Sequence, residues 1–170
     1  MIIINAIRKR YSCRAYKDKP IEKEKLDIIL EAARLAPSAK NLQDWRFVVV
    51  TEKQIKQKVA DCTNRPEVFS KAGVIIAACS ISKDVMRCGQ AVAPIDVAIA
   101  LEHIAIQATE LGLGTCWIGS FETENVREIL GIPDDVQIIE LMSVGYPADS
   151  WKQPNREPIE KIICYDKWQF

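Results

Sequence analysis

Three polar side chains alternate along a short segment near the N-terminus: Arg10, Ser12 and Arg14. In extended backbone, alternate residues point to one side, so two guanidinium groups and a hydroxyl would face one ligand. Guanidinium groups bind phosphate through planar, paired hydrogen bonds. The spacing therefore indicates a site for a phosphate-bearing ligand, although the same residues taken alone also fit a solvated basic turn.

Two further segments favour the close approach of a ligand to the backbone. In Pro37–Asn41 a proline ends a helix, two small residues follow, and Asn41 can both donate and accept hydrogen bonds. In Thr115–Gly119 the side chains offer little acid–base chemistry, but Gly119 leaves room for a ligand. The alternatives are a turn rich in helix-capping residues and an edge strand that ends in a glycine.

Conventional catalytic and metal-binding patterns are absent from the sequence. The glycine cluster Gly112–Gly119 lacks the third glycine of a G-x-G-x-x-G fingerprint, and it follows a helix rather than a strand. The single histidine, His103, lies among apolar residues, and none of the six cysteines forms a C-x-x-C pair. We therefore expect no metal site, reduced and mostly buried cysteines, and no side chain that is an obligate acid or base.

The composition is that of an ordinary globular chain. Hydrophobic residues make up 48% and charged residues 27%, and 23 basic residues balance 23 acidic ones. This balance gives no support for nucleic acid or a membrane surface as a partner. No apolar stretch approaches the roughly 20 residues of a transmembrane helix, and the N-terminal apolar residues precede the basic ones, the reverse of a secretory signal. We expect one cytoplasmic domain over residues 1–170.

The hydrophobic periodicity predicts a sheet layered with helices, without assigning the strand order. Strands are expected at 47–50, 74–81, 115–118 and 136–144, and helices at 2–9, between Pro20 and Pro37, around 55–62, at 94–111 and after a capping Thr123. The helix from Pro94 is apolar on more than one face, which favours burial against a second copy of itself. Residues 147–170 are expected to form an extended C-terminal tail.

Four segments together resemble the nitroreductase family of flavin enzymes. They are Arg10–Arg14 (R-x-S-x-R), Ala36–Phe47 (A-P-S-x-x-N-x-Q-x-W-x-F), Gly112–Gly119, and Val144–Pro147 followed by Arg156. The first two match the family in residue types and separation, and the last two more loosely. The chain departs from the family pattern at Tyr11, at Asp44 and at Glu157, which stands where many members have a lysine and weakens the phosphate site.

The resemblance implies an α+β fold with a mainly antiparallel sheet of four to five strands, in a homodimer with shared flavin sites. It implies FMN as the cofactor and NADH or NADPH as the electron donor. The loop Pro37–Asn41 would reach the partner's flavin, and the N–H groups near Ile118 and Gly119 would face flavin N5 and its adjoining carbonyl. The residues assigned to the cofactor are Arg10, Tyr11, Ser12, Arg14, Pro37, Ser38, Ala39, Asn41, Asn64, Cys116, Trp117, Ile118, Gly119 and Arg156.

The implied activity is the ping-pong reduction of small acceptors such as nitroaromatics or quinones. One alternative is a flavin-binding sensor or carrier without turnover. Another is a specialised chemistry such as dehalogenation or dehydrogenation, against which the short chain argues because it leaves little room for a lid over the flavin. Asn64 and Arg156 match the family only weakly and also fit ordinary surface positions.

Overall fold

A four-stranded antiparallel sheet organises the computed structural model, which describes residues 3–151 and 155–170. The strands lie in the order β1-β2-β4-β3, and every neighbouring pair is antiparallel. Their bounds are Trp45–Val50 (β1), Val74–Ser80 (β2), Gly114–Ile118 (β3) and Gln137–Gly145 (β4). This architecture confirms the predicted α+β class and supplies the strand order that the periodicity left open.

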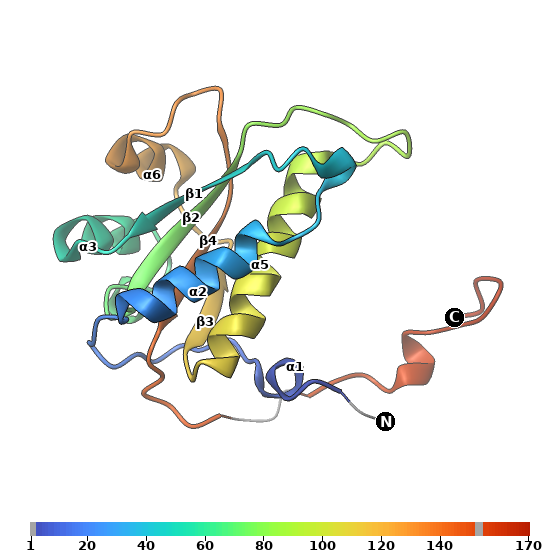
Figure 1. Ribbon diagram of the computed structural model, residues 1–170, viewed down its shortest axis with the longest axis horizontal. Coiled ribbons are helices and arrows are strands. Elements are labelled where there is room, and N and C mark those ends of the chain that lie inside the picture. The colour runs from blue at the N-terminus through green and yellow to red at the C-terminus, as the bar shows by residue number, and fades with distance from the viewer. Residues whose placement is uncertain (1–2, 152–154) are drawn as a thin grey trace.

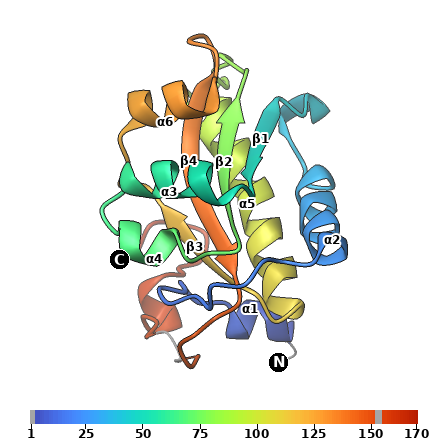
Figure 2. The ribbon, with the colours of Figure 1, turned by 90° about the vertical axis from the view of Figure 1, so that its left-hand side faces the viewer.

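Helices cover both faces of the sheet (Figures 1 and 2). One face packs against α2 and α5, and the other against the shorter α3, α4 and α6. The helix bounds are Asn5–Lys9 (α1), Lys23–Arg34 (α2), Lys53–Asp61 (α3), Pro66–Phe69 (α4), Val92–Glu110 (α5) and Thr123–Leu130 (α6), with short 3-10 turns at Ala39–Asn41 (η1) and Ile159–Lys161 (η2). The sheet therefore separates two hydrophobic cores.

Strand β2 shows why this sequence needs two helical layers. All seven of its residues are buried. Ile75 and Ala77 point into the core beneath α3 and α6, whereas Ile76 and Ala78 point into the core beneath α5. A strand that is apolar on both faces must be covered on both faces.

Several element boundaries differ from the sequence expectations. The first helix begins at Asn5, and Ile2, its expected start, lies outside the described residues. Helix α5 begins at Val92 rather than Pro94, because a proline is tolerated in the first helical turn. The expected cap at Thr123 is wrong: Glu122 is the N-cap of α6, without a side-chain cap hydrogen bond, and Thr123 is the first helical residue.

Helix α5 is the central helix of the larger core. Val97, Leu101 and Ile104 are fully buried, and the His103 Nδ1 lies 3.2 Å from the Ala32 carbonyl oxygen of α2. By length and composition α5 could cross a membrane, which corrects the expectation that no stretch approaches a span. Half of this apolar stretch is buried within the fold, as in the core helix of a layered protein.

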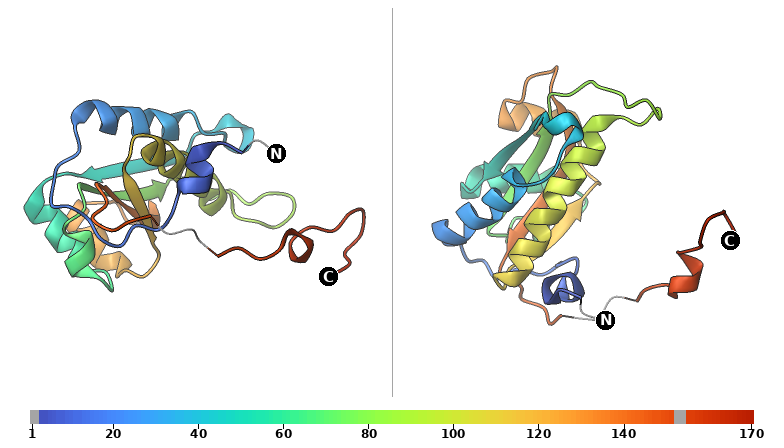
Figure 3. Two further views of the ribbon diagram at one scale, coloured as in Figure 1. Left: turned by 90° about the horizontal axis from the view of Figure 1, so that it is seen from below. Right: turned by 45° about the vertical axis from the view of Figure 1, so that its right-hand side comes forward.

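The C-terminal segment 155–170 extends away from the rest of the chain (Figures 1 and 3). It is rich in exposed apolar side chains: Ile162 is 61% exposed and Trp168 is 83% exposed. The Trp168 ring packs edge-on against Phe170, with their centroids 4.9 Å apart.

Candidate functional site

The basic N-terminal segment lies along the edge strand β3. Ser12 forms a parallel bridge with Thr115, and the Cys13 N–H donates to the Thr115 carbonyl oxygen at 2.8 Å. A Cβ on Gly114 would lie 2.7 Å from the Cβ of Cys13, so this close approach requires a glycine. The structure thus brings together two segments that the sequence singled out and that lie about a hundred positions apart in the chain.

The two predicted arginines have different contacts. The Arg10 Nε lies 3.7 Å from the Glu102 Oε1 on α5, and the Arg10 side chain is 20% exposed. Arg14 is exposed, and its Nη1 donates to the Ser12 carbonyl oxygen at 3.4 Å. Arg10 is therefore partly engaged by an acidic residue, whereas Arg14 faces solvent with its charge available to an anion.

The thiol of Cys116 reports the electrostatics at this edge of the sheet. Burial raises its pKa, while the positive charges of Arg14, Arg65 and Arg10 oppose that rise. Three guanidinium groups thus act on one buried group of β3. Arg65 belongs to none of the sequence motifs, and only its position next to Asn64 could have indicated a place near the site.

Asn64 lies beside the segment that follows β3. Thr63 bridges to Phe121, and the Glu122 N–H donates to the Cys62 carbonyl oxygen at 2.9 Å. The side chain of Asn64 is exposed. The structure therefore places this weakly predicted residue near the end of β3, on the same side of the fold as α3 and α6.

The end of β3 presents backbone rather than side chains. Cys116 and Ile118 point into the core beneath α3 and α6, Trp117 packs on the α5 side, and Gly119 is exposed. A Cβ on Gly119 would lie 3.5 Å from Oε1 of Glu140, in ordinary contact. Gly119 is therefore the exposed residue at this point, and the expected ligand contact at Ile118 and Gly119 stays a prediction.

The loop before β1 is held by Asp96, in the second turn of α5. The Ala39 N–H donates to both carboxylate oxygens of Asp96, at 3.2 and 3.1 Å, and the Ser38 hydroxyl accepts from the N–H of Gln43 at 3.0 Å. Pro37 and Asn41 are exposed. Asp96 could not be identified from the sequence. It is a single acidic residue within an apolar helix, and no motif links it to its partner, the Ala39 N–H.

The backbone of the same loop is strained. Lys40, Asn41 and Gln43 have φ values of 51°, 56° and 56°, in the left-handed region that few residues other than glycine adopt. Residues in such conformations cluster at ligand-binding sites. The strain and the Asp96 contact together hold Asn41 outward on a fixed turn.

Within one chain, α5 separates this loop from the N-terminal basic segment. The loop contacts Asp96, and Arg10 contacts Glu102. Six residues of α-helix correspond to about 9 Å along the axis and about 240° around it. The two predicted binding segments therefore lie on different sides of α5. Arg156 is also apart: it is exposed in the tail, where its Nη1 donates to the Asn155 carbonyl oxygen.

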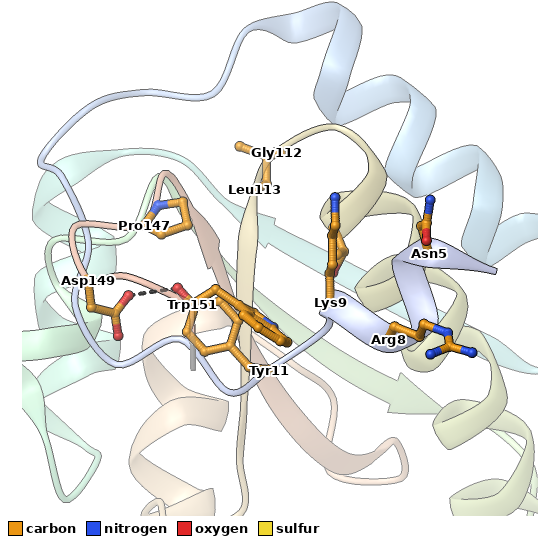
Figure 4. A pocket seen from close by; sticks show the side chains of 10 residues that line it. Asn5, Arg8, Lys9, Tyr11, Gly112, Leu113, Pro147, Asp149 and Trp151 are labelled. Atoms are coloured by element: carbon orange, nitrogen blue, oxygen red, sulfur yellow. Dashed lines mark hydrogen bonds between the residues drawn. The ribbon is translucent and has the colours of Figure 1, made fainter. Parts of the chain in front are cut away.

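A cavity of about 560 Å³ adjoins the basic segment on the side of α1 (Figure 4). Lys9 and Arg8 lie on one side of it, and Tyr11, Asp149 and Trp151 on the other. The Tyr11 hydroxyl donates to the Asp149 Oδ1 at 2.7 Å. Burial, the hydrogen bond to Asp149 and its charge raise the pKa of Tyr11. The hydroxyl of this predicted site residue is thus directed to Asp149.

Comparison with known proteins gives a consistent result over nearly the whole chain. The model of the Nitroreductase family matches residues 7–65 and 59–146. A nitroreductase family protein of Clostridium difficile 630 is 32% identical, with a TM-score of 0.88, covering 99% of this chain and 100% of that chain. An FMN-dependent nitroreductase of Clostridium difficile R20291 is 33% identical, with a TM-score of 0.79, covering 99% and 98%. An NADPH-dependent oxidoreductase of Staphylococcus aureus (strain USA300) is 26% identical, over 98% of this chain and 74% of that protein.

Proposed function

Because this chain belongs to the nitroreductase family of oxidoreductases, we propose that it binds FMN and uses NADH or NADPH to reduce small acceptors such as nitroaromatics or quinones. The observation that carries the proposal is the pairing of Ser12 with Thr115. That pairing brings the Arg10–Arg14 segment to the strand whose exposed end, Gly119, is accessible to a flat ring. The free cysteines fit a reducing compartment, which supports a cytoplasmic location.

The residues at this edge of the sheet fit the cofactor. A terminal phosphate requires positive charge, and the guanidinium groups of Arg10, Arg14 and Arg65 all act on the Cys116 thiol. A flavin ring requires an exposed surface without projecting side chains, and Gly119 supplies one. Glu157, in the exposed tail, pairs with Lys161 at 2.9 Å, so its charge is partly neutralised.

FMN held by these residues would supply the hydride-transfer chemistry between the nicotinamide donor and the acceptor. The chain itself supplies binding and orientation. Arg14 and Arg10 would neutralise the phosphate, and Ser12 would donate its hydroxyl to it. The backbone N–H of Gly119 would orient the ring edge, while the Ile118 N–H donates to the Glu140 carboxyl group. Half-buried Trp117, on the α5 side of β3, would restrict the access of water, and water would supply the proton for reduction of the acceptor.

We propose that the site is completed by a second copy of the chain. The loop Pro37–Asn41 contacts α5 at Asp96 and the segment Arg10–Arg14 contacts it at Glu102, on a different side of the helix, so the loop is available to the site of a partner chain. A two-fold partner would bring its own loop to the site, and two-fold pairing is the commonest closed assembly. The apolar residues that α5 exposes, such as Ile95 at 40%, support this arrangement.

The absorption spectrum of the purified protein tests the cofactor, and a NAD(P)H oxidation assay tests the activity. We expect a yellow protein that releases FMN on denaturation and oxidises NADH or NADPH when a quinone or nitroaromatic is added. Riboflavin, which lacks the phosphate, should bind much more weakly than FMN. A protein that neither contains nor binds FMN would refute the proposal. Flavin binding without NAD(P)H oxidation would instead support a sensor or carrier.

A further inference from the structure

Glu140 lies at the end of β3 and outside the set of residues that the family motifs identify. It is an acidic residue in an otherwise apolar stretch of β4, between Ile139 and Leu141. The last pair between β3 and β4 joins Ile118 to Leu141, so Glu140 stands opposite Gly119, one step further on. The register with β2 shifts after its partner Ala78, and such irregularities re-aim side chains near functional sites.

One oxygen of the Glu140 carboxyl group lacks the hydrogen-bond partner that a buried charge needs. Its Oε1 is buried without a hydrogen-bond partner among the described residues, and no ion pair of the described residues involves it. Burial raises its pKa above the ordinary value of 4.5, and the backbone N–H groups of Ile118 and Leu141 partly oppose that rise. No charged side chain contributes to the shift. Cys116 on β3 is the titratable group that senses the charge of Glu140.

The empty space next to this carboxyl lies at Gly119. A Cβ there would be 3.5 Å from Oε1 and 3.7 Å from Oε2, and Gly119 has no side chain to fill that space. Gly119 is exposed. Water would therefore reach an ionised Glu140 carboxylate at Gly119, which is the surface that the flavin ring must cover.

We propose that Glu140 is a positioning residue for the flavin site: in its protonated form it supports the Ile118–Gly119 backbone, and its ionisation opposes the binding of a ring over Gly119. The inference rests on the proposed FMN function. Covering Gly119 removes the water that an ionised carboxylate requires, and burying an unpaired charge is costly. Flavin binding and protonation of Glu140 are therefore linked, so that binding takes up a proton wherever the free protein holds Glu140 ionised.

The first test titrates FMN into the flavin-free protein at a series of pH values from about 5 to 9, following the loss of flavin fluorescence. The variant is Glu140→Gln, which is uncharged at every pH, and the control is Glu128→Gln, at an exposed position of α6. Relative to Glu140→Gln, the unaltered protein and the control should lose affinity by up to about tenfold per pH unit above the pKa of Glu140. The FMN phosphate titrates in all three proteins, so it cancels in the comparison, and burial raises the pKa of Cys116 above 9.0, so that its thiol stays protonated over this pH range.

A second readout requires neither flavin nor activity. A raised folded-state pKa means that the stability contributed by protonated Glu140 is complete below pH 4.5, its ordinary value, and is lost as the pH rises through the folded-state pKa. The melting temperature of the flavin-free protein should therefore fall in that window more steeply for the unaltered chain than for Glu140→Gln. Equal pH slopes for the two proteins would overturn the inference.

A third measurement uses the unaltered protein alone and covers the case in which Glu140→Gln does not fold. Calorimetric binding of riboflavin, which has no phosphate proton, in buffers of different ionisation enthalpy reports proton uptake. We expect net uptake above the pKa of Glu140, and its absence would overturn the role of Glu140. Failure of any flavin to bind at any pH would instead refute the proposed function, so the two failures are distinguishable.

Discussion

Gly114→Ala separates the role of the basic segment from the role of β3. The added methyl group would lie 2.7 Å from the Cys13 Cβ and 2.8 Å from its Sγ, whereas ordinary Cβ contacts begin at 3.4 Å. The segment must therefore retreat by roughly 0.7 Å, at a cost of about 1–3 kcal/mol, typical of overpacking. The same retreat would stretch the Cys13–Thr115 hydrogen bond, now 2.8 Å, beyond the usual range of such bonds.

The measurements are thermal unfolding of the flavin-free protein and fluorescence titration with FMN. We expect Gly114→Ala to lower the Tm by about 2–12 °C, since 1 kcal/mol corresponds to about 2–4 °C in a chain of this size. FMN affinity should fall as well, because Ser12 and the two arginines move away from β3. Binding should weaken more for FMN than for riboflavin.

Gly119→Ala provides the matched control on the same strand edge. Its methyl group would be 3.5 Å from the nearest Glu140 oxygen, an ordinary contact, so the Tm should change little. FMN affinity should nevertheless fall, because the methyl group occupies the surface that the ring would cover. If Gly114→Ala left both the Tm and the affinity unchanged, the pairing of the basic segment with β3 could not be what forms the site.

The remaining predictions concern the arginines and the shared site. Replacing Arg10 or Arg14 by Ala removes a charge-assisted contact of about 1.5–3 kcal/mol, so FMN should bind roughly tenfold or more weakly. Riboflavin binding should change little. Unchanged FMN affinity in both variants would instead support the alternative that these residues form a solvated basic turn. Inactive Arg10→Ala and Asn41→Ala proteins should regain partial activity when unfolded and refolded together, because each mixed dimer contains one intact site. An active, flavin-bound monomer by light scattering would refute the shared site but not FMN binding.

The sequence predicted best those features that depend on local pattern. The apolar runs gave strands at β1 and β2, and the long apolar helix, α5, was found within a few residues of its true ends. The spacing of Arg10, Ser12 and Arg14 singled out a segment that the structure places beside β3, a position that the spacing did not predict. Periodicity, amphipathicity and motif spacing are properties of neighbouring residues, so a single sequence displays them.

Features that depend on distant contacts were not predictable. The order β1-β2-β4-β3 follows from which faces must be buried together, and several orders satisfy the same pattern. Asp96 and Glu140 read as isolated acidic residues in apolar segments, because the groups they approach, Ala39 and Gly119, lie 57 and 21 positions away. Thr123 failed as a cap because local propensity places a polar residue near a helix start without fixing the first turn.

The strand order also dictates when the site can form during synthesis. β4 lies between β2 and β3 in the sheet, yet among the strands of the described residues it is made after the other three. Within the part of the chain that the structure describes, β3 pairs as a strand only with β4, so it has no sheet neighbour until residue 145 has emerged. The Arg10–Arg14 segment is made earlier still and has no strand to pair with until β3 is present. At roughly 5–20 residues per second, this segment spends several seconds without its partner. A nascent chain therefore gains the proposed phosphate site only after β4 has been made.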